Sequence, residues 1–213
     1  MKFRNLFYLI HTDILRYARE NQNYSEKSNG IAKDQPPLTF LKKISILLLP
    51  CVSSITLHRF SHFCWLRKHY LWSRFFWTLN IIFFSAEIIP FSEIGPYFYM
   101  PHPTGIGIMG KIGKNATIFL QGCLAGGRKD IDIGGGIGSP VIGDDVVIGI
   151  GAKVVGPVRI GNNVTIGPGS LILKNIPDNC VVFGIPARII RNQSKAPADG
   201  AINAEEESEV FIE

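Results

Sequence analysis

The chain has 213 residues, of which 46% are hydrophobic, and this composition excludes a wholly disordered protein. Its net charge of +5 is unevenly spread, because residues 1–93 carry 12 Lys/Arg against 6 Asp/Glu whereas residues 194–213 carry 1 against 6. No basic run alternates with stacking aromatic residues in a nucleic-acid-binding motif, so we expect no nucleic acid as a partner.

The N-terminal part of the chain is expected to be helical. Residues 1–37 combine apolar groups at helical spacing with a polar stretch that starts at Asn21, which predicts one helix followed by a linker. In residues 38–87 the apolar side chains come three and four apart with basic residues between them. This spacing predicts two or three amphipathic helices.

Potential metal ligands are few. The four cysteines are Cys51, Cys64, Cys123 and Cys180. They form no Cys-x-x-Cys pair, so neither a zinc site nor a disulfide framework is expected. His58 and His62 lie one helical turn apart, but they have no evident third ligand, and packing explains them better than metal binding. We predict no metal.

The N-terminus lacks a signal-peptide pattern, and no segment offers the 18 or so uncharged apolar residues of a spanning helix. A cytoplasmic protein is therefore expected. Buried packing or an oligomer interface explains the basic, aromatic N-terminal half better, and peripheral attachment to the inner face of the membrane stays open.

Apolar residues recur every six positions after the helical part. The register comprises Ile94, Met100, Ile106, Ile112, Ile118, Leu124, Ile142, Ile148, Val154, Ile160, Ile166 and Ile172. Eleven of these twelve are Ile, Val or Leu, where chance would give about three. A solenoid that turns one side chain inward per short strand produces this period, and helices or flat sheets do not. We predict a parallel β-helix over residues 88–191.

Two segments depart from the repeat. The register would turn Asp130 inward, and burying an unpaired carboxylate is costly, so the Gly-rich residues 125–141 are expected to leave the coil as a loop. The acidic residues 192–213 are expected to form a disordered tail. Residues 105–110 fit a Gly-x-Gly-x-x-Gly motif, but they lie inside the hexad array with no helix after them, which argues against nucleotide binding.

His102 is the candidate catalytic base, held between two prolines near a corner of the coil. A histidine can take a proton from an alcohol near pH 7, and a carboxylate on its other ring nitrogen would fix its tautomer. Glu87, at the junction of the helical and β-helical parts, is the candidate carboxylate. From the residues alone, a hydrogen-bonded structural role explains His102 equally well.

Three segments resemble the signature of the serine acetyltransferase-like branch of the hexapeptide acyltransferases: Glu87-Ile-Ile-Pro, His102-Pro-Thr-Gly and Gln121-Gly-Cys-Leu-Ala-Gly-Gly127. The similarity covers about residues 55–191. It implies a left-handed β-helix, a homotrimer and acetyl-CoA as donor. It also implies a His–carboxylate pair that deprotonates an acceptor hydroxyl for direct attack on the thioester. His102 matches the family base, and Glu87 stands where the family usually has Asp. Pairing of trimers into a hexamer stays open.

The same resemblance assigns further residues. Donor contacts would come from Ile150, Gly151, Ala152, Pro168, Gly169, Ser170, Lys174 and Arg188. Candidate residues of the substrate loops are Pro101, Gln121, Gly126, Gly127 and Ser139. Backbone N–H groups near Gly126 and Gly127 are candidate oxyanion donors.

The acceptor is inferred from positions at which this sequence differs from serine acetyltransferases. Serine acetyltransferases carry an acidic residue before the base and an Arg-His pair opening the second block of hexads; here these positions hold Pro101, and Gly138 with Ser139. A zwitterion needs charged partners, so we expect an uncharged saccharide hydroxyl instead. The resulting hypothesis is an O-acetyltransferase of capsular or other surface polysaccharide. The alternatives are a serine O-acetyltransferase of cysteine biosynthesis and a non-catalytic hexapeptide scaffold.

Overall fold

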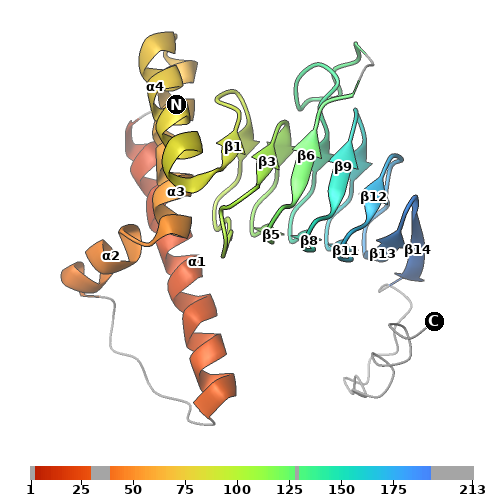
Figure 1. The fold of residues 1–213 in the computed structure, drawn as a ribbon, viewed down its shortest axis with the longest axis horizontal. Helices are drawn as coiled ribbons and strands as arrows, with labels where there is room; N and C mark the ends of the chain where they lie inside the picture. Colours follow the sequence, from red (N-terminus) through yellow and green to blue (C-terminus); the bar gives the residue numbers. More distant parts are fainter. Residues whose placement is uncertain (1–2, 30–38, 128–129, 193–213) are drawn as a thin grey trace.

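The computed structural model describes residues 3–29, 39–127 and 130–192. A bundle of helices stands at one end of a β-helix, and the long first helix crosses that end (Figure 1). The helices are α1 (Phe3–Asn29), α2 (Phe40–Leu47), α3 (Pro50–Leu66) and α4 (Tyr70–Phe84). The acidic tail predicted for residues 192–213 lies almost wholly outside the described residues.

Short strands wind into three parallel sheets, which form the three sides of the β-helix. Sheet A contains, in spatial order, β1 (Glu87–Ile88), β3 (Gly107–Ile108), β6 (Cys123–Ala125), β9 (Lys153–Val155) and β12 (Leu171–Ile172). Sheet B contains β10 (Arg159–Ile160), β7 (Val141–Ile142), β4 (Lys111–Ile112) and β2 (Glu93–Ile94). Sheet C contains β14 (Ala187–Asn192), β13 (Cys180–Gly184), β11 (Thr165–Ile166), β8 (Val147–Ile148) and β5 (Thr117–Ile118). Only β13 and β14 pair antiparallel among these strands.

The core of the β-helix is the stack of aliphatic side chains that the six-residue period predicted. Every residue of that register is buried, and together they form one continuous cluster. Burying one such side chain contributes about 1.5–3 kcal/mol, so the stacked coils supply most of the hydrophobic stabilisation of this part. The inward-facing pattern is confirmed.

One detail of the predicted register is wrong. The inward residue of sheet A in the second coil is Ile108, which pairs with Ile88 and Leu124, and not Ile106. Eight residues separate Met100 from Ile108, whereas six separate Ile118 from Leu124. The corner between sheets C and A therefore has two extra residues here. Ile106 is still buried, because the longer corner folds it back over the core.

Helix α1 is also longer than the sequence predicted. It continues from Asn21 to Asn29, where a polar linker was expected. Polar composition alone does not end a helix, since Gln, Glu and Lys are good helix formers and no Gly or Pro occurs before Gly30.

The segment between β6 and β7 leaves the coil, as its Gly-rich sequence predicted, and rises beside sheet A (Figure 1). Hydrogen bonds hold its base: Gly127 N donates to Gly138 O over 2.9 Å, and Gly138 N donates to Ile131 O over 2.9 Å. The guanidinium of Arg159 in β10 donates to Ile133 O. The loop is thus tied to the coil at both its base and its outer part.

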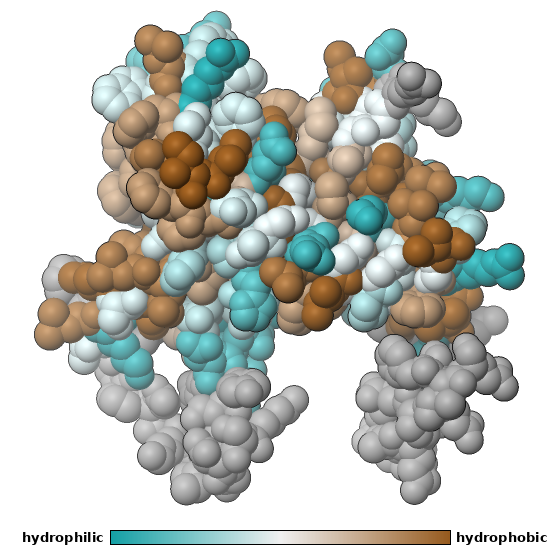
Figure 2. Space-filling view, in the orientation of Figure 1, coloured by the Kyte–Doolittle hydropathy of each residue, from teal (hydrophilic) through white to brown (hydrophobic). Residues whose placement is uncertain are grey.

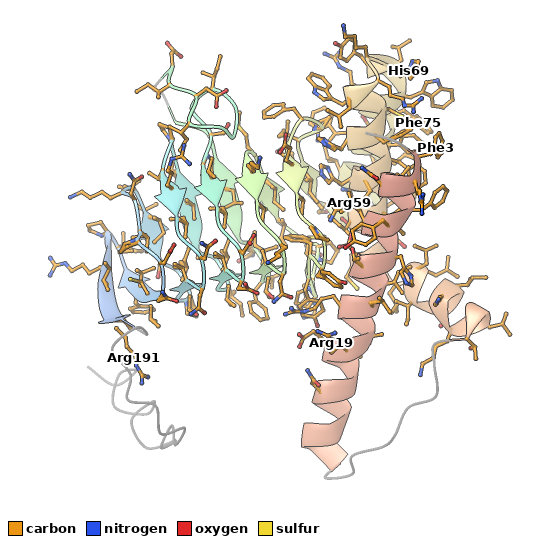
Figure 3. The ribbon with its side chains drawn as sticks, turned by 180° about the vertical axis from the view of Figure 1, so that it is seen from behind. Phe3, Arg19, Arg59, His69, Phe75 and Arg191 are labelled. Carbon is orange, nitrogen blue, oxygen red and sulfur yellow. The ribbon has the colours of Figure 1, made fainter. Side chains whose placement is uncertain are left out.

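Buried Arg59 joins the helices to the β-helix (Figure 3). Its Nε donates to Oδ2 of Asp13 in α1 over 3.0 Å, and its Nη2 donates to Gly95 O over 2.7 Å. Its Nη1 donates to Ile94 O. Asp13 in turn accepts a hydrogen bond from Phe98 N over 3.0 Å. One ion pair therefore connects α1, α3 and the first coil.

No single described helix is long and apolar enough to cross a membrane. Helices α2 and α3 together, over Leu41–Leu47 and Pro50–Leu66, do meet the criteria of length and composition, but the chain bends by 82° between them.

We expect Arg59→Met to destabilise the protein by about 3–5 kcal/mol, because it leaves the Asp13 carboxylate buried without its cation. Chemical denaturation followed by circular dichroism measures the loss. Arg74→Met, at an exposed arginine of α4, is the matched control and should change the free energy of unfolding by less than about 0.5 kcal/mol. Equal stability of the two variants would contradict the anchoring role of Arg59.

Candidate active site

His102 lies on the lengthened corner between sheets C and A, with its side chain exposed. Pro101 and Pro103 flank it and restrict the backbone on both sides. Gly105 N donates to Ser85 O over 3.0 Å, which ties this corner to the residues just before β1. The imidazole is therefore displayed at the junction of the helices and the β-helix.

Glu87 is the exposed residue of β1, and its neighbour Ile88 points into the core. Glu87 pairs with Gly107 of β3, and Gly107 pairs with Cys123 of β6. Because Gly107 has no side chain, none stands between Glu87 and Cys123. Both candidate catalytic residues thus lie at the helical end of sheet A. No hydrogen bond or ion pair joins Glu87 to His102 within the part of the chain that the structure describes.

The outer face of sheet A holds two residues that sequence reasoning missed. Cys123 and Lys153 are in register with Glu87, one residue before an inward aliphatic side chain in each strand. Burial raises the pKa of the Cys123 thiol, and Glu87 raises it further while Lys153 opposes the shift. Many residues of the chain stand just before an aliphatic residue of the hexad register, so the sequence alone did not single out these two.

Six of the eight residues predicted to hold the donor lie along the same corner as His102. Gly169 N donates to Ile150 O over 2.8 Å, and Gly151 N donates to Leu120 O over 2.9 Å, so these turns stack coil upon coil. Gln121, Gly151 and Gly169 all have positive φ, at 59°, 69° and 66°. A side-chain-free residue keeps the outer surface of such a turn open.

The stacked turns also include the other predicted donor residues of these coils. Ile150, Pro168 and Gly169 are exposed, whereas Ala152 and Ser170 are buried. The Ser170 hydroxyl accepts a hydrogen bond from Gly184 N over 3.2 Å, so it supports the fold. Only the exposed members of the set can contact a bound molecule directly.

The remaining predicted residues are not on this corner. Gly126, Gly127 and Lys174 lie on the next corner, between sheets A and B, and Arg188 is exposed on β14 in sheet C. Ser139 is buried in the loop and donates its hydroxyl to Ile137 O over 3.3 Å. The structure of one chain therefore does not bring these five to His102.

A pocket of about 410 Å³ lies beside His102. It is lined by Tyr17, Leu49, Pro50, Cys51, Phe83, Phe84, Ser85, Pro101, His102, Pro103 and Thr104. Helices α1, α3 and α4 therefore form one wall and the His102 corner forms the other. Its polar groups are hydroxyls, a thiol and the imidazole, which suits a small molecule that presents a hydroxyl to His102.

His58 and His62 are packing residues at the interface of α3 with the β-helix. Their rings stack with centroids 5.9 Å apart, and Nδ1 of His62 lies 2.9 Å from Pro90 O. Burial, and then the charge of Arg59, lowers the pKa of His58 well below its usual value. No cluster of three His, Cys, Asp or Glu side chains suited to a metal ion occurs in the described residues.

Comparison with known proteins places the chain among hexapeptide transferases. Residues 139–174 match the family model "Bacterial transferase hexapeptide (six repeats)". A Bacillus pumilus protein named serine acetyltransferase is 35% identical over 164 residues, which cover 76% of this chain and 74% of that protein. A Mycobacterium tuberculosis protein of the same name is 32% identical over 168 residues, covering 78% and 72%. The chain belongs to the serine acetyltransferase family.

Solved structures of the family agree. Serine acetyltransferase from Neisseria gonorrhoeae has a TM-score of 0.73 at 25% identity, with 94% of this chain and 73% of that chain covered. The soybean serine acetyltransferase solved with serine has a TM-score of 0.68 at 25% identity, with 87% and 69% covered. The predicted left-handed parallel β-helix with a helical N-terminal region, and the predicted acyltransferase, are confirmed.

The preference for a saccharide acceptor and for capsular polysaccharide enzymes is wrong, because the relatives at 32–35% identity are named serine acetyltransferases. The preference came from uncharged residues at Pro101, Gly138 and Ser139. Such positions show which side chains do not bind the acceptor, and they do not identify the acceptor.

A pH dependence of stability follows from His58. Burial lowers the pKa of His58 in the folded protein. Below about pH 6.5 the unfolded chain therefore binds a proton at His58 that the folded protein does not bind. The free energy of unfolding falls as the solution is acidified. In His58→Leu this fall should be shallower between about pH 7 and 5.5, by up to about 1.4 kcal/mol per pH unit. Denaturant titrations at several pH values measure the slope.

The matched control is His69→Leu, since His69 is exposed at the start of α4. It should keep the wild-type slope. An unchanged slope in His58→Leu would show that the buried ring does not titrate with folding.

Proposed function

We propose that the chain is a serine O-acetyltransferase, which transfers the acetyl group of acetyl-CoA to the hydroxyl of L-serine. The observation that carries this proposal is the identity of 32–35%, over about three quarters of the chain, with proteins named serine acetyltransferase. The His102 corner beside a pocket of about 410 Å³ supports it, because the reaction needs a base next to a small hydroxyl compound.

In the proposed reaction, His102 takes the proton of the serine hydroxyl as the oxygen attacks the thioester carbonyl carbon. The tetrahedral intermediate then collapses, the C–S bond breaks, and the imidazolium returns its proton to the leaving thiolate of CoA. Glu87 would orient the imidazole and stabilise its charged form. Glu87 is exposed, and its flexible side chain must turn toward His102 to do so.

The donor would lie along the corner of stacked turns. Exposed Ile150, Pro168 and Gly169 line this corner in successive coils, so an extended pantetheine arm can run over them toward His102. Gly169 helps because a Cβ there would protrude into open space along the proposed path. Lys174 and Arg188 would meet the phosphates of the donor if a neighbouring chain presents them.

We further propose that the active form is a homotrimer. On one chain, His102 and the exposed turn residues face solvent, and Gly126, Gly127 and Lys174 lie on a different corner. A neighbouring β-helix packed against the His102 corner would bring to it the corner between its own sheets A and B. Each site would then contain residues of two chains. Light scattering of the purified protein gives the number of chains.

Incubation of the purified chain with acetyl-CoA and L-serine tests the function directly. We expect release of CoA thiol, and formation of O-acetylserine detected by mass spectrometry, at a rate that saturates with serine. Hydrolysis of acetyl-CoA at the same rate without serine would refute the proposal. Absence of saturable acetyl-CoA binding would instead favour the non-catalytic scaffold, which has no need of a groove for the donor.

His102→Ala should lower kcat by about 10²–10⁴-fold, since general base catalysis contributes that much, with little change in acetyl-CoA binding. Glu87→Gln should lower kcat less and leave the fold intact, because Glu87 acts through the imidazole. Stopped assays and light scattering measure both. Nearly full activity of a correctly assembled His102→Ala variant would place the base elsewhere.

A further inference from the structure

Helix α4 is packed with its polar side inward. Its two buried residues are Ser73 and Asn80, which face α3. Ser73 and Ser61 exchange hydrogen bonds through their hydroxyls and carbonyls, at 2.9 and 2.8 Å. Ser54 donates to Oδ1 of Asn80 over 2.7 Å. Small polar residues thus join the two helices, which is how helices associate in an apolar surrounding.

The outward side of α4 is correspondingly apolar. The exposed fraction is 86% for Leu71, 61% for Trp72, 67% for Ile82 and 70% for Phe83. Brown atoms gather over this part of the molecule in Figure 2, and Phe75 points away from the β-helix in Figure 3. Soluble surfaces rarely present so many large apolar side chains on one helix, so this face needs an apolar contact.

The charged residues of α3, α4 and the turn between them have one sign. Residues 40–86 contain no Asp or Glu and six Lys/Arg. Arg67 and Lys68 are exposed in the turn between α3 and α4, and Arg74 is exposed within α4. Arg67 also lies over the ring of Phe63, 4.7 Å from its centroid, so its charge is held at this end of the helix pair. The N-terminal part of the apolar face is therefore flanked by cations, and the nearest carboxylate along the chain, Glu87, lies beyond the C-terminal end of α4.

We propose that α4 docks in the plane of an anionic lipid surface, with its apolar side among the acyl chains and its flanking cations on the headgroups. A two-fold contact with a second copy of this chain fits the face less well, because it would bring Arg67, Lys68 and Arg74 near the same cations of its partner. An anionic bilayer supplies both the apolar contact and the opposite charge.

The geometry favours an interfacial helix over a spanning one. Helix α4 has 15 residues, or about 22 Å of length, whereas the hydrocarbon core of a bilayer is about 30 Å thick. Exposed Trp72 and Tyr70 have the amphipathic rings that favour the headgroup boundary. Phe83 at the C-terminal end of α4 also lines the pocket beside His102, whereas Leu71 and Trp72 at the other end of the helix do not. Substitutions at Leu71 and Trp72 therefore test docking without changing the walls of the pocket.

Sedimentation of the full chain with vesicles tests the proposal. We expect binding to phosphatidylcholine vesicles that contain about 30% phosphatidylglycerol, and much weaker binding to pure phosphatidylcholine. The double variant Leu71→Glu/Trp72→Glu should bind at least about tenfold more weakly. Lys68→Gln/Arg74→Gln should bind about 25-fold more weakly, since each cation contributes about fivefold near such a surface.

Ile185→Glu is the matched control, because Ile185 is 74% exposed between β13 and β14, at the end of the β-helix away from α4; it should keep wild-type vesicle binding. Leu71→Glu/Trp72→Glu should acetylate in solution at the wild-type rate, which separates this test from that of the proposed function. Absence of vesicle binding, or equal binding to both compositions, would overturn the proposal. A lower molecular mass of the double variant in light scattering, with no vesicle binding by the wild type, would assign the face to contacts between copies.

Discussion

The ion pair between Arg59 and Asp13 is the constraint on which the rest of the structure depends. Burial raises the pKa of Asp13 in spite of the neighbouring guanidinium, so the pair is costly to bury and must be fully hydrogen-bonded to persist. The guanidinium also donates to the backbone carbonyls of Ile94 and Gly95, and the carboxylate accepts a hydrogen bond from the amide of Phe98. The pair specifies one orientation of the helices against the first coil. The pocket beside His102 has walls from both parts, and its shape depends on that orientation.

The fold was predictable from the sequence because its core depends on a period. Each short strand turns one aliphatic residue inward, so an aliphatic residue recurs at the same position of every coil. Ile118, Ile148 and Ile166 are paired in this way in sheet C. The burial of Arg59 was not predictable, because an arginine between apolar residues of a helix looks like part of a solvated face. Its partner lies 46 residues away, and no local pattern reports such a pairing.

The site was predictable in part. His102 and Glu87 were chosen as candidates because proline, histidine and carboxylate stand out where the repeat begins, and the structure places both at one end of sheet A. Cys123 and Lys153 were missed because they occupy ordinary positions of the repeat, and only the stacking of strands aligns them with Glu87. The acceptor was misjudged because specificity depends on partners from several coils and loops. A missing charge at one position does not determine the others.

The lengthened corner at His102 has a further consequence. Met100 and Ile108 are two residues farther apart than the usual step, yet Ile112 follows Ile108 after only four residues, so the coil as a whole keeps its length. The excess at one corner is cancelled at the next, and every later coil stays in phase with the first. The His102 corner can therefore vary in length and shape without disturbing the coils stacked beyond it. A β-helix of this kind can acquire a new substrate by exchanging residues between two adjacent turns, with its hydrophobic core unchanged.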